Sequence, residues 1–165
     1  MVDLCCGTGA LGAALWAAAP DATLYAVDRD PAAVRCARRN LLAHRVYEGN
    51  LYDALPPELA GRVKLMVANA PYVPSASLSQ MPREARLYEA PRALDGGVDG
   101  LDVLRRVADG SPTWLAVGGH LLVESSAAQA PHVATHFSRC GLLATVTYCK
   151  PLEATVVTGR KPFAP

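Results

Sequence analysis

A glycine-rich turn near the N-terminus constrains the fold more than any other feature of this sequence. Gly7-Thr8-Gly9-Ala10-Leu11-Gly12 fits the pattern G-x-G-x-x-G, follows a short apolar run at 2–4 and precedes an expected helix over 13–19. Asp28 comes at the end of the next expected strand. In such a unit the glycines bring the backbone close to a ligand, the helix N-terminus offers free N–H groups, and the carboxylate accepts hydrogen bonds from ribose hydroxyls. The motif therefore predicts a site for a nucleotide-type cofactor.

Strand-like runs alternate with helical patterns along the rest of the chain, and this alternation predicts an α/β fold with a mostly parallel sheet. The expected strands cover residues 2–4, 23–27, 46–48, 63–68, 120–125, 142–148 and 154–158, and the further expected helices cover 31–42, 101–109 and 130–140. The turn at 150–153 is so short that the last two strands are expected to be antiparallel. Residues 71–100 show no regular pattern, and irregular stretches of this length often carry function.

Length and charge place the chain among ordinary globular domains. Its 165 residues fit one domain, and 16 Lys and Arg against 15 Asp and Glu give a net charge of +1. This balance excludes a charged disordered tail and lacks the basic excess of proteins that bind the phosphate backbone of nucleic acids. The longest apolar run, 9–19, is shorter than the roughly twenty residues of a membrane span and has no basic residue before it. We therefore expect a cytoplasmic protein with no membrane partner.

The spacing of cysteine and histidine residues predicts no metal site. The five cysteines include no C-x-x-C pair and their number is odd, which favours reduced thiols that pack as small apolar groups. His132 and His136 lie four residues apart on an expected helix, a spacing that can hold a metal ion. The sequence pattern supplies no third ligand beside them, so we expect no bound metal.

Two cofactors fit the glycine turn and Asp28: a nicotinamide dinucleotide and S-adenosylmethionine (AdoMet). Asp3 favours the second, because Asp3-Leu4-Cys5-Cys6-Gly7-Thr8-Gly9 resembles motif I of class I AdoMet-dependent methyltransferases, in which an acidic residue shortly precedes G-x-G. The resemblance implies that the acid steadies the glycine loop and the methionine end of the cofactor, and that the loop after the third strand meets the adenine. Asn50 stands there, where the family more often has Asp. The implied cofactor-binding residues are Asp3, Cys5, Gly7, Thr8, Gly9, Asp28, Arg29, Asn50 and Leu51.

Asn69-Ala70-Pro71-Tyr72 directly follows the fourth expected strand and looks like the N-P-P-Y motif of methyltransferases that modify planar amino groups, with Ala in place of the first Pro. An amide nitrogen is a poor nucleophile because its lone pair is delocalised. The side-chain oxygen of Asn69 and the backbone carbonyl of Ala70 can each accept one N–H of such a group, and Tyr72 offers a face for stacking. Catalysis then rests on orientation, since the cofactor already carries the reactive methyl group. The candidate catalytic residues are Asn69, Ala70, Pro71 and Tyr72.

The segment 88–102 resembles E-P-x-x-A-L-x-G-G-x-D-G-L-D of the HemK/PrmC protein-(glutamine-N5) methyltransferases. Pro91 is displaced by one position, and the residues in register are Glu89, Ala93, Leu94, Gly96, Gly97, Asp99, Gly100, Leu101 and Asp102. Residues 121–124 with Gln129 also look like the fifth-strand region of that family.

This resemblance implies a Rossmann-like class I methyltransferase fold: a seven-stranded, mostly parallel sheet with an antiparallel last strand and helices on both faces. It also implies one methyltransferase domain over 1–165, with a substrate-side loop at 73–100. We expect this domain to be truncated at its N-terminus, because family members carry a helical substrate-recognition domain before motif I.

The implied activity is methyl transfer from AdoMet to a protein glutamine side-chain amide, with the Gly-Gly-Gln loop of a class-1 peptide-chain release factor as the acceptor. Three alternatives remain open: a nucleic-acid methyltransferase acting on adenine N6 or guanine N2, a non-catalytic AdoMet-binding module, and a dinucleotide oxidoreductase. The near-neutral charge argues against the first, and the Asn-Ala-Pro-Tyr motif argues against the last. Glu89 is expected either to hold the loop or to line the acceptor site.

Overall fold

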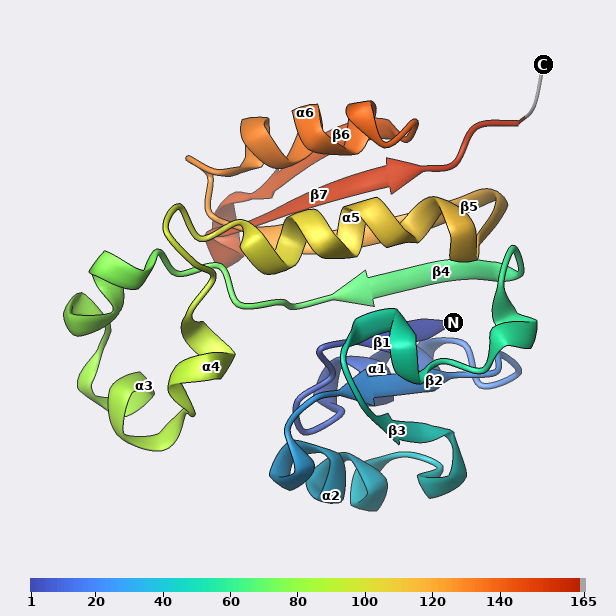
Figure 1. Cartoon of the computed structure of the whole chain (residues 1–165), viewed down its shortest axis with the longest axis horizontal. Coiled ribbons are helices and arrows are strands. Elements are labelled where there is room, and N and C mark those ends of the chain that lie inside the picture. The colour runs from blue at the N-terminus through green and yellow to red at the C-terminus, as the bar shows by residue number, and fades with distance from the viewer. Residues whose placement is uncertain (164–165) are drawn as a thin grey trace.

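The computed structural model describes residues 1–163, with the side chains of all of them except residues 85 and 86. Residues 164–165 of the predicted domain lie outside the described residues. Seven strands form one sheet in the order β3-β2-β1-β4-β5-β7-β6 (Figure 1). The strands are β1 (Val2–Leu4), β2 (Tyr25–Asp28), β3 (Val46–Glu48), β4 (Val63–Ala68), β5 (Leu115–Ser125), β6 (Leu143–Cys149) and β7 (Ala154–Arg160).

The directions of the strands confirm the predicted sheet. β1 pairs in parallel with β2 and β4, β2 pairs in parallel with β3, and β4 with β5. β7 lies between β5 and β6 and is antiparallel to both. The chain moves outwards from β1 to β3 and then returns to β4 on the other side of β1, so the strand order reverses between β1 and β4. Open parallel sheets bind their ligands at such a reversal, beyond the carboxyl ends of the strands.

Helices cover both faces of the sheet because successive residues of a strand point to opposite sides. Val27 of β2 belongs to a core cluster with Phe137 of α6 (Ala130–Arg139) and with residues of α5 (Asp102–Trp114). The preceding residue, Ala26, belongs to a second cluster with Val34 of α2 (Pro31–Asn40). α1 (Ala10–Ala18) packs beside α2. Two apolar clusters therefore lie on opposite faces of the sheet.

α5 extends beyond its predicted end. The helix expected over 101–109 was predicted to stop at Gly110, but α5 continues through Gly110 and Pro112 to residue 114. Proline has no N–H to donate to the carbonyl four residues earlier, which belongs to Ala108. That carbonyl accepts from the hydroxyl of Ser111 at 2.9 Å instead, and α5 ends two residues after the proline.

The stretch 71–100 is less irregular than predicted. It contains the 3-10 turn η4 (Ser75–Gln80) and the short helices α3 (Arg83–Tyr88) and α4 (Pro91–Leu94). Pro91 occupies the first position of α4, where its fixed φ favours a helical start. The remaining 3-10 turns are η1 (Ala43–Arg45), η2 (Leu51–Ala54), η3 (Pro57–Leu59) and η5 (Lys150–Leu152).

β5 begins at Leu115, five residues before its predicted start at 120. Its pairing with β4 shifts register between Val63 and Leu65, and Gly119 makes this possible because a Cβ there would lie 2.6 Å from the carbonyl oxygen of Val63. No helix in the described part of the chain has both the length and the hydropathy that crossing a membrane requires.

Candidate active site

A cleft of about 730 Å³ opens at the carboxyl ends of β1, β2 and β4, where the strand order reverses. It is lined by both predicted motifs. Of the predicted cofactor-binding residues, the cleft wall contains Asp3, Cys5, Gly7, Thr8, Asp28, Arg29, Asn50 and Leu51. It also contains Asn69, Ala70, Pro71 and Tyr72. The structure therefore brings together the two groups of residues that the sequence predicted separately.

Gly9 is the predicted site residue that does not line the cleft. It caps α1, and a Cβ on it would lie 2.9 Å from a methyl carbon of Leu41 and 3.4 Å from the Cα of Ala37. Gly9 therefore lets α1 pack closely against α2. The G-x-G pattern alone does not distinguish this packing role of Gly9 from contact with a ligand.

Gly7 faces the cleft without crowding. Its φ is 54°, and apart from Gly7 and its two chain neighbours no heavy atom of the described residues lies within 4 Å of the position that a Cβ would take. The neighbouring Cys5 also has a positive φ of 55°, which is uncommon for a residue with a side chain. Burial raises the pKa of the Cys5 thiol to about 12, so it lines the cleft as a neutral group. The turn thus presents backbone and small apolar atoms to a ligand.

Asp3 is a fully buried carboxylate in β1, an interior strand of the sheet, and it also lines the cleft. Its Oδ2 accepts a hydrogen bond from the backbone N–H of Gly12 in α1 at 2.9 Å. Its Oδ1 is buried and has no hydrogen-bond partner among the described residues. Burial raises the pKa of Asp3 to about 7, the Gly12 N–H opposes this rise, and the nearby charge of Asp28 adds to it. A buried carboxylate with one free oxygen fits a ligand that brings a positive charge.

This free oxygen separates the two cofactors that the glycine turn allows. AdoMet carries a sulfonium and an ammonium group, and either is attracted to the Asp3 carboxylate. A dinucleotide would place its anionic pyrophosphate at the glycine turn, close to the buried carboxylate of Asp3, where the two negative charges repel each other. The residues present therefore fit AdoMet better than a dinucleotide.

Asp28 ends β2 and is held by two backbone donors. Its Oδ2 accepts from the N–H of Gly7 and its Oδ1 from the N–H of Asp30, both at 2.8 Å. Each oxygen keeps a second lone pair for a ribose hydroxyl. Asp30 caps α2 by accepting from the N–H of Ala32 at 2.8 Å, and it forms a 2.9 Å ion pair with Arg92. The hydrogen bond from Ala32 and the ion pair with Arg92 both lower the pKa of Asp30.

Arg92 joins the ribose side of the cleft to the 73–100 segment, and the sequence analysis did not single it out. Besides its ion pair with Asp30, its backbone carbonyl accepts from Nη2 of Arg29 at 3.3 Å. Other cleft residues outside the motifs are Met81, Val103 and Arg106. They come from the 73–100 segment and α5, and they reach the cleft only through the folding of distant parts of the chain.

The adenine side of the predicted site follows β3. Leu51 is buried and adopts a positive φ of 52°, and Asn50 beside it is exposed at the cleft wall. The N–H of Gly49 donates to the carbonyl of Asp28 at 3.0 Å, which ties this turn to β2. A strained backbone at a cleft is typical of positions with a functional role.

The acceptor motif follows β4 directly. Ala70 is buried, and Asn69 is exposed at the cleft wall. Burial raises the pKa of the Tyr72 phenol, and the charges of Glu124 and Glu89 raise it further, so the phenol stays protonated. Glu89 is exposed and lines the cleft, which agrees with the second of its two expected roles.

His136 has partners that the sequence pattern did not reveal, and all of them lie outside the cleft. Its Nε2 is 2.8 Å from Oδ1 of Asp109 on α5, and the thiol of Cys140 donates to the same oxygen at 3.5 Å. One ligand-type atom from each of the three lies within 4.8 Å of the others. His132 lines a separate cavity of about 160 Å³ between α5 and α6.

Comparison with known proteins gives the family. Residues 1–100 match the sequence family described as Methyltransferase small domain. The chain belongs to the methyltransferase small domain family. The chain is 37% identical over 163 residues to the release factor glutamine methyltransferase of Geobacter sulfurreducens, covering 96% of this chain and 56% of that relative. It is 36% identical over 129 residues to the ribosomal protein uL3 glutamine methyltransferase of Bordetella pertussis, covering 74% of this chain and 42% of that relative.

Solved structures agree on the fold of this family member. A methyltransferase from Pyrococcus furiosus superposes with a TM-score of 0.70 at 12% identity, covering 98% of this chain and 74% of that one. The class I methyltransferase fold predicted from the sequence is therefore confirmed. The chain spans about half the length of the curated relatives it matches.

Proposed function

We propose that this methyltransferase domain transfers a methyl group from AdoMet to the side-chain amide of a protein glutamine, with the Gly-Gly-Gln loop of a class-1 release factor as the acceptor. One observation carries the proposal: Asp3, whose buried Oδ1 has no hydrogen-bond partner among the described residues, lines the same cleft as Asn69 and Ala70. A residue suited to a cation and two residues suited to an amide thus line one cleft. The names of the two relatives add support for a glutamine acceptor.

In this proposal the residues after β1, β2 and β3 bind the cofactor. Asp3 faces its positive end, Asp28 and Arg29 hold the ribose side, and Asn50 with Leu51 borders the adenine. Cys5, Gly7 and Thr8 form the turn between them. AdoMet supplies a methyl group bonded to a positively charged sulfur, so no side-chain nucleophile is needed.

The acceptor residues work by orientation. The Asn69 oxygen and the Ala70 carbonyl each accept one N–H of the glutamine amide, which directs the nitrogen lone pair at the methyl carbon. A nitrogen–carbon bond forms as the sulfur–carbon bond breaks, the sulfur becomes neutral, and the nitrogen releases one proton to water. Pro71 restricts the loop, and Tyr72 stacks on the planar amide.

A protein acceptor suits the surface beside the cleft better than a nucleic acid does. Leu87, Tyr88 and Val98 of the 73–100 segment are exposed by 61%, 84% and 90%. Exposed apolar side chains on a functional loop are typical of protein-binding surfaces. The net charge of +1 provides little attraction for phosphates. A cytoplasmic location, where release factors act, is part of the proposal.

The test is a methyl-transfer assay with labelled AdoMet and the full-length protein that contains this chain. The acceptors are a class-1 release factor, the same factor with Ala in place of the loop glutamine, ribosomal protein uL3, and RNA and DNA duplexes. We expect one methyl group on the loop glutamine and none on the alanine variant. Transfer to uL3 alone keeps the chemistry and changes the acceptor, whereas transfer to nucleic acid alone overturns the proposal.

A further inference from the structure

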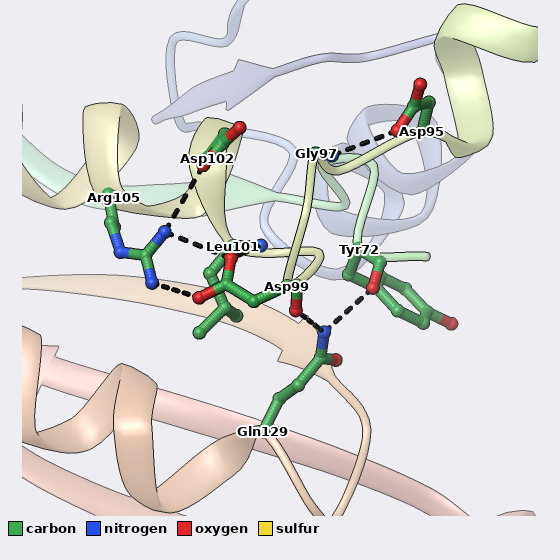
Figure 2. Close-up of polar contacts among 8 residues, drawn as sticks. All are labelled: Tyr72, Asp95, Gly97, Asp99, Leu101, Asp102, Arg105 and Gln129. Carbon is green, nitrogen blue, oxygen red and sulfur yellow. Dashed lines mark hydrogen bonds and ion pairs between the residues drawn. The ribbon is translucent and has the colours of Figure 1, made fainter. Parts of the chain in front are cut away.

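Gln129 reaches the acceptor loop from behind the cleft. It lies at the start of α6, and its side chain is buried. Its Nε2 donates to the backbone carbonyl of Tyr72 at 2.9 Å and to that of Asp99 at 3.0 Å (Figure 2). Its Oε1 accepts from the hydroxyl of Ser126 at 2.8 Å. The single amide group of Gln129 therefore joins three segments: the acceptor loop, the loop before α5 and the turn after β5.

Gly100 makes this close approach possible. Its φ is 77°, and a Cβ there would lie 2.3 Å from the carbonyl oxygen of Tyr72 and 2.4 Å from Nε2 of Gln129. Any side chain at this position would force the two groups apart. The glycine in the middle of the 95–102 loop thus serves the contact between the acceptor loop and α6.

The 95–102 loop is itself held firmly, so it gives Gln129 a fixed partner. The Asp99 carboxylate accepts from the N–H of Leu101 at 3.1 Å and pairs with Arg105 of α5 (Figure 2). On the other side, the N–H of Val73 donates to the Leu94 carbonyl at 3.0 Å. The acceptor loop is therefore bonded at Tyr72 and at the residue after it.

The backbone carbonyl and the ring of Tyr72 point in different directions. Figure 2 shows the Tyr72 carbonyl directed at Gln129 and the ring pointing away from it. Gln129 does not line the cleft, whereas Asn69, Ala70 and Tyr72 do. The Gln129 amide is thus placed to fix the path of the loop and leaves its acceptor-facing groups free.

We propose that Gln129 is a positioning residue for the amide acceptor. By holding the Tyr72 carbonyl against the 95–102 loop, it fixes the Asn69 oxygen and the Ala70 carbonyl relative to the cofactor side of the cleft. This proposal rests on the proposed function. It also gives a reason why alanine is tolerated at position 70, since a loop with one proline instead of two is stiffened from behind by hydrogen bonds.

The test compares Gln129→Met with Thr135→Ala in the full-length protein. Gln129→Met keeps the length of the side chain and removes both donors. Thr135→Ala removes an exposed hydroxyl that donates to the carbonyl of Pro131 on the same helix, and it leaves every contact of Gln129 in place. Three quantities are measured: hydrogen exchange of the backbone amides of residues 72–75 and 95–102, AdoMet affinity by calorimetry, and kcat and KM for methyl transfer to the release factor.

For Gln129→Met we expect exchange about tenfold faster in those two segments and unchanged in β4. We expect kcat to fall about 10- to 100-fold, since small misplacements of reacting groups have large effects on rate. AdoMet affinity stays within about threefold, and Thr135→Ala behaves as the wild type does in all three measurements. If Gln129→Met unfolds the protein, Gln129→Asn replaces it, because its shorter side chain cannot reach both carbonyls.

Other outcomes separate the two proposals. Unchanged exchange, or faster exchange with an unchanged kcat, overturns the positioning role and leaves the proposed function intact. An equal loss of kcat in Thr135→Ala also overturns it, because the bonds to Tyr72 and Asp99 are then not the cause. Absence of methylglutamine with the wild-type protein refutes the proposed function, and the positioning role with it.

Discussion

The carboxylate of Asp28 accepts a hydrogen bond from the backbone N–H of Gly7 at 2.8 Å. This contact links the end of β2 to the glycine turn after β1, so the residue predicted to hold the ribose also shapes the loop predicted to surround the methionine end. Ribose binding and the geometry of the glycine turn are therefore expected to depend on the same side chain.

Asp28→Asn is expected to weaken AdoMet binding by about tenfold or more, because an amide cannot accept from both Gly7 and Asp30 while also facing two ribose hydroxyls. Calorimetric titration measures the change. Asp53→Asn is the matched control, since Asp53 is exposed in the nearby turn η2 and does not line the cleft. Equal losses in both variants would contradict a specific role for Asp28.

The raised pKa of Asp3 predicts that cofactor binding depends on pH around neutrality. Its pKa in the folded protein is raised to about 7 from an ordinary 3.8, so the folded chain keeps this proton while the unfolded chain releases it. The contribution of Asp3 to the free energy of unfolding therefore falls as pH rises from 3.8 to about 7, and is constant above that.

A cationic cofactor favours the ionised form of Asp3. AdoMet affinity is expected to rise by about tenfold per pH unit below neutrality and to level off above it, if binding requires this one carboxylate to lose its proton. In Asp3→Asn the carboxylate contribution to this rise disappears and binding at high pH is weaker. Titrations at several pH values check this, and a wild-type affinity that decreases with pH over the same range would contradict it.

Asn69→Ala is expected to lower kcat by about 100-fold or more while AdoMet affinity stays within about threefold, because Asn69 is predicted to orient the acceptor and not the cofactor. Ala70→Pro is the companion variant, since it keeps the backbone carbonyl that is predicted to accept the second N–H. We expect it to retain activity within about threefold. Single-turnover transfer to a release factor measures both, and normal turnover in Asn69→Ala would rule out the role assigned to it.

Gly100→Ala tests the close contact behind the acceptor loop. Gly61 has a similar φ of 70° but open space around its Cβ position, so Gly61→Ala measures the backbone strain alone. We expect Gly61→Ala to lower the free energy of unfolding by about 1 kcal/mol and Gly100→Ala by about 1–3 kcal/mol more. Denaturant unfolding of the two variants gives the difference, and equal values would show that the steric contact is unimportant.

The features that could be predicted from the sequence are those that depend on local residue patterns. The glycine turn, the acidic strand end and the acceptor motif were located because strand–turn–helix units repeat residue types at fixed spacing. Contacts between distant segments left no such pattern: Gln129 lies 57 positions from Tyr72, and no spacing rule links them. Gly9 was predicted to bind the cofactor, and the pattern G-x-G does not reveal its packing against Leu41.

Helix ends were predicted less well than motifs for a related reason. Gly110 and Pro112 normally end helices, but α5 continues past both, and its buried residues include Ala108 and Ser111. His136 likewise lacked partners in the sequence pattern, because Asp109 comes from another helix.

Because Asp3 is buried in an interior strand of the sheet, we expect cofactor binding and folding to be coupled. Filling the cleft with a cation removes the penalty of an unpaired acid at the centre of the protein. At a cofactor concentration about 100 times the dissociation constant, mass action adds about 2.7 kcal/mol to the stability of the folded chain. Cells depleted of AdoMet would then hold less of this protein, because proteases degrade the unfolded fraction.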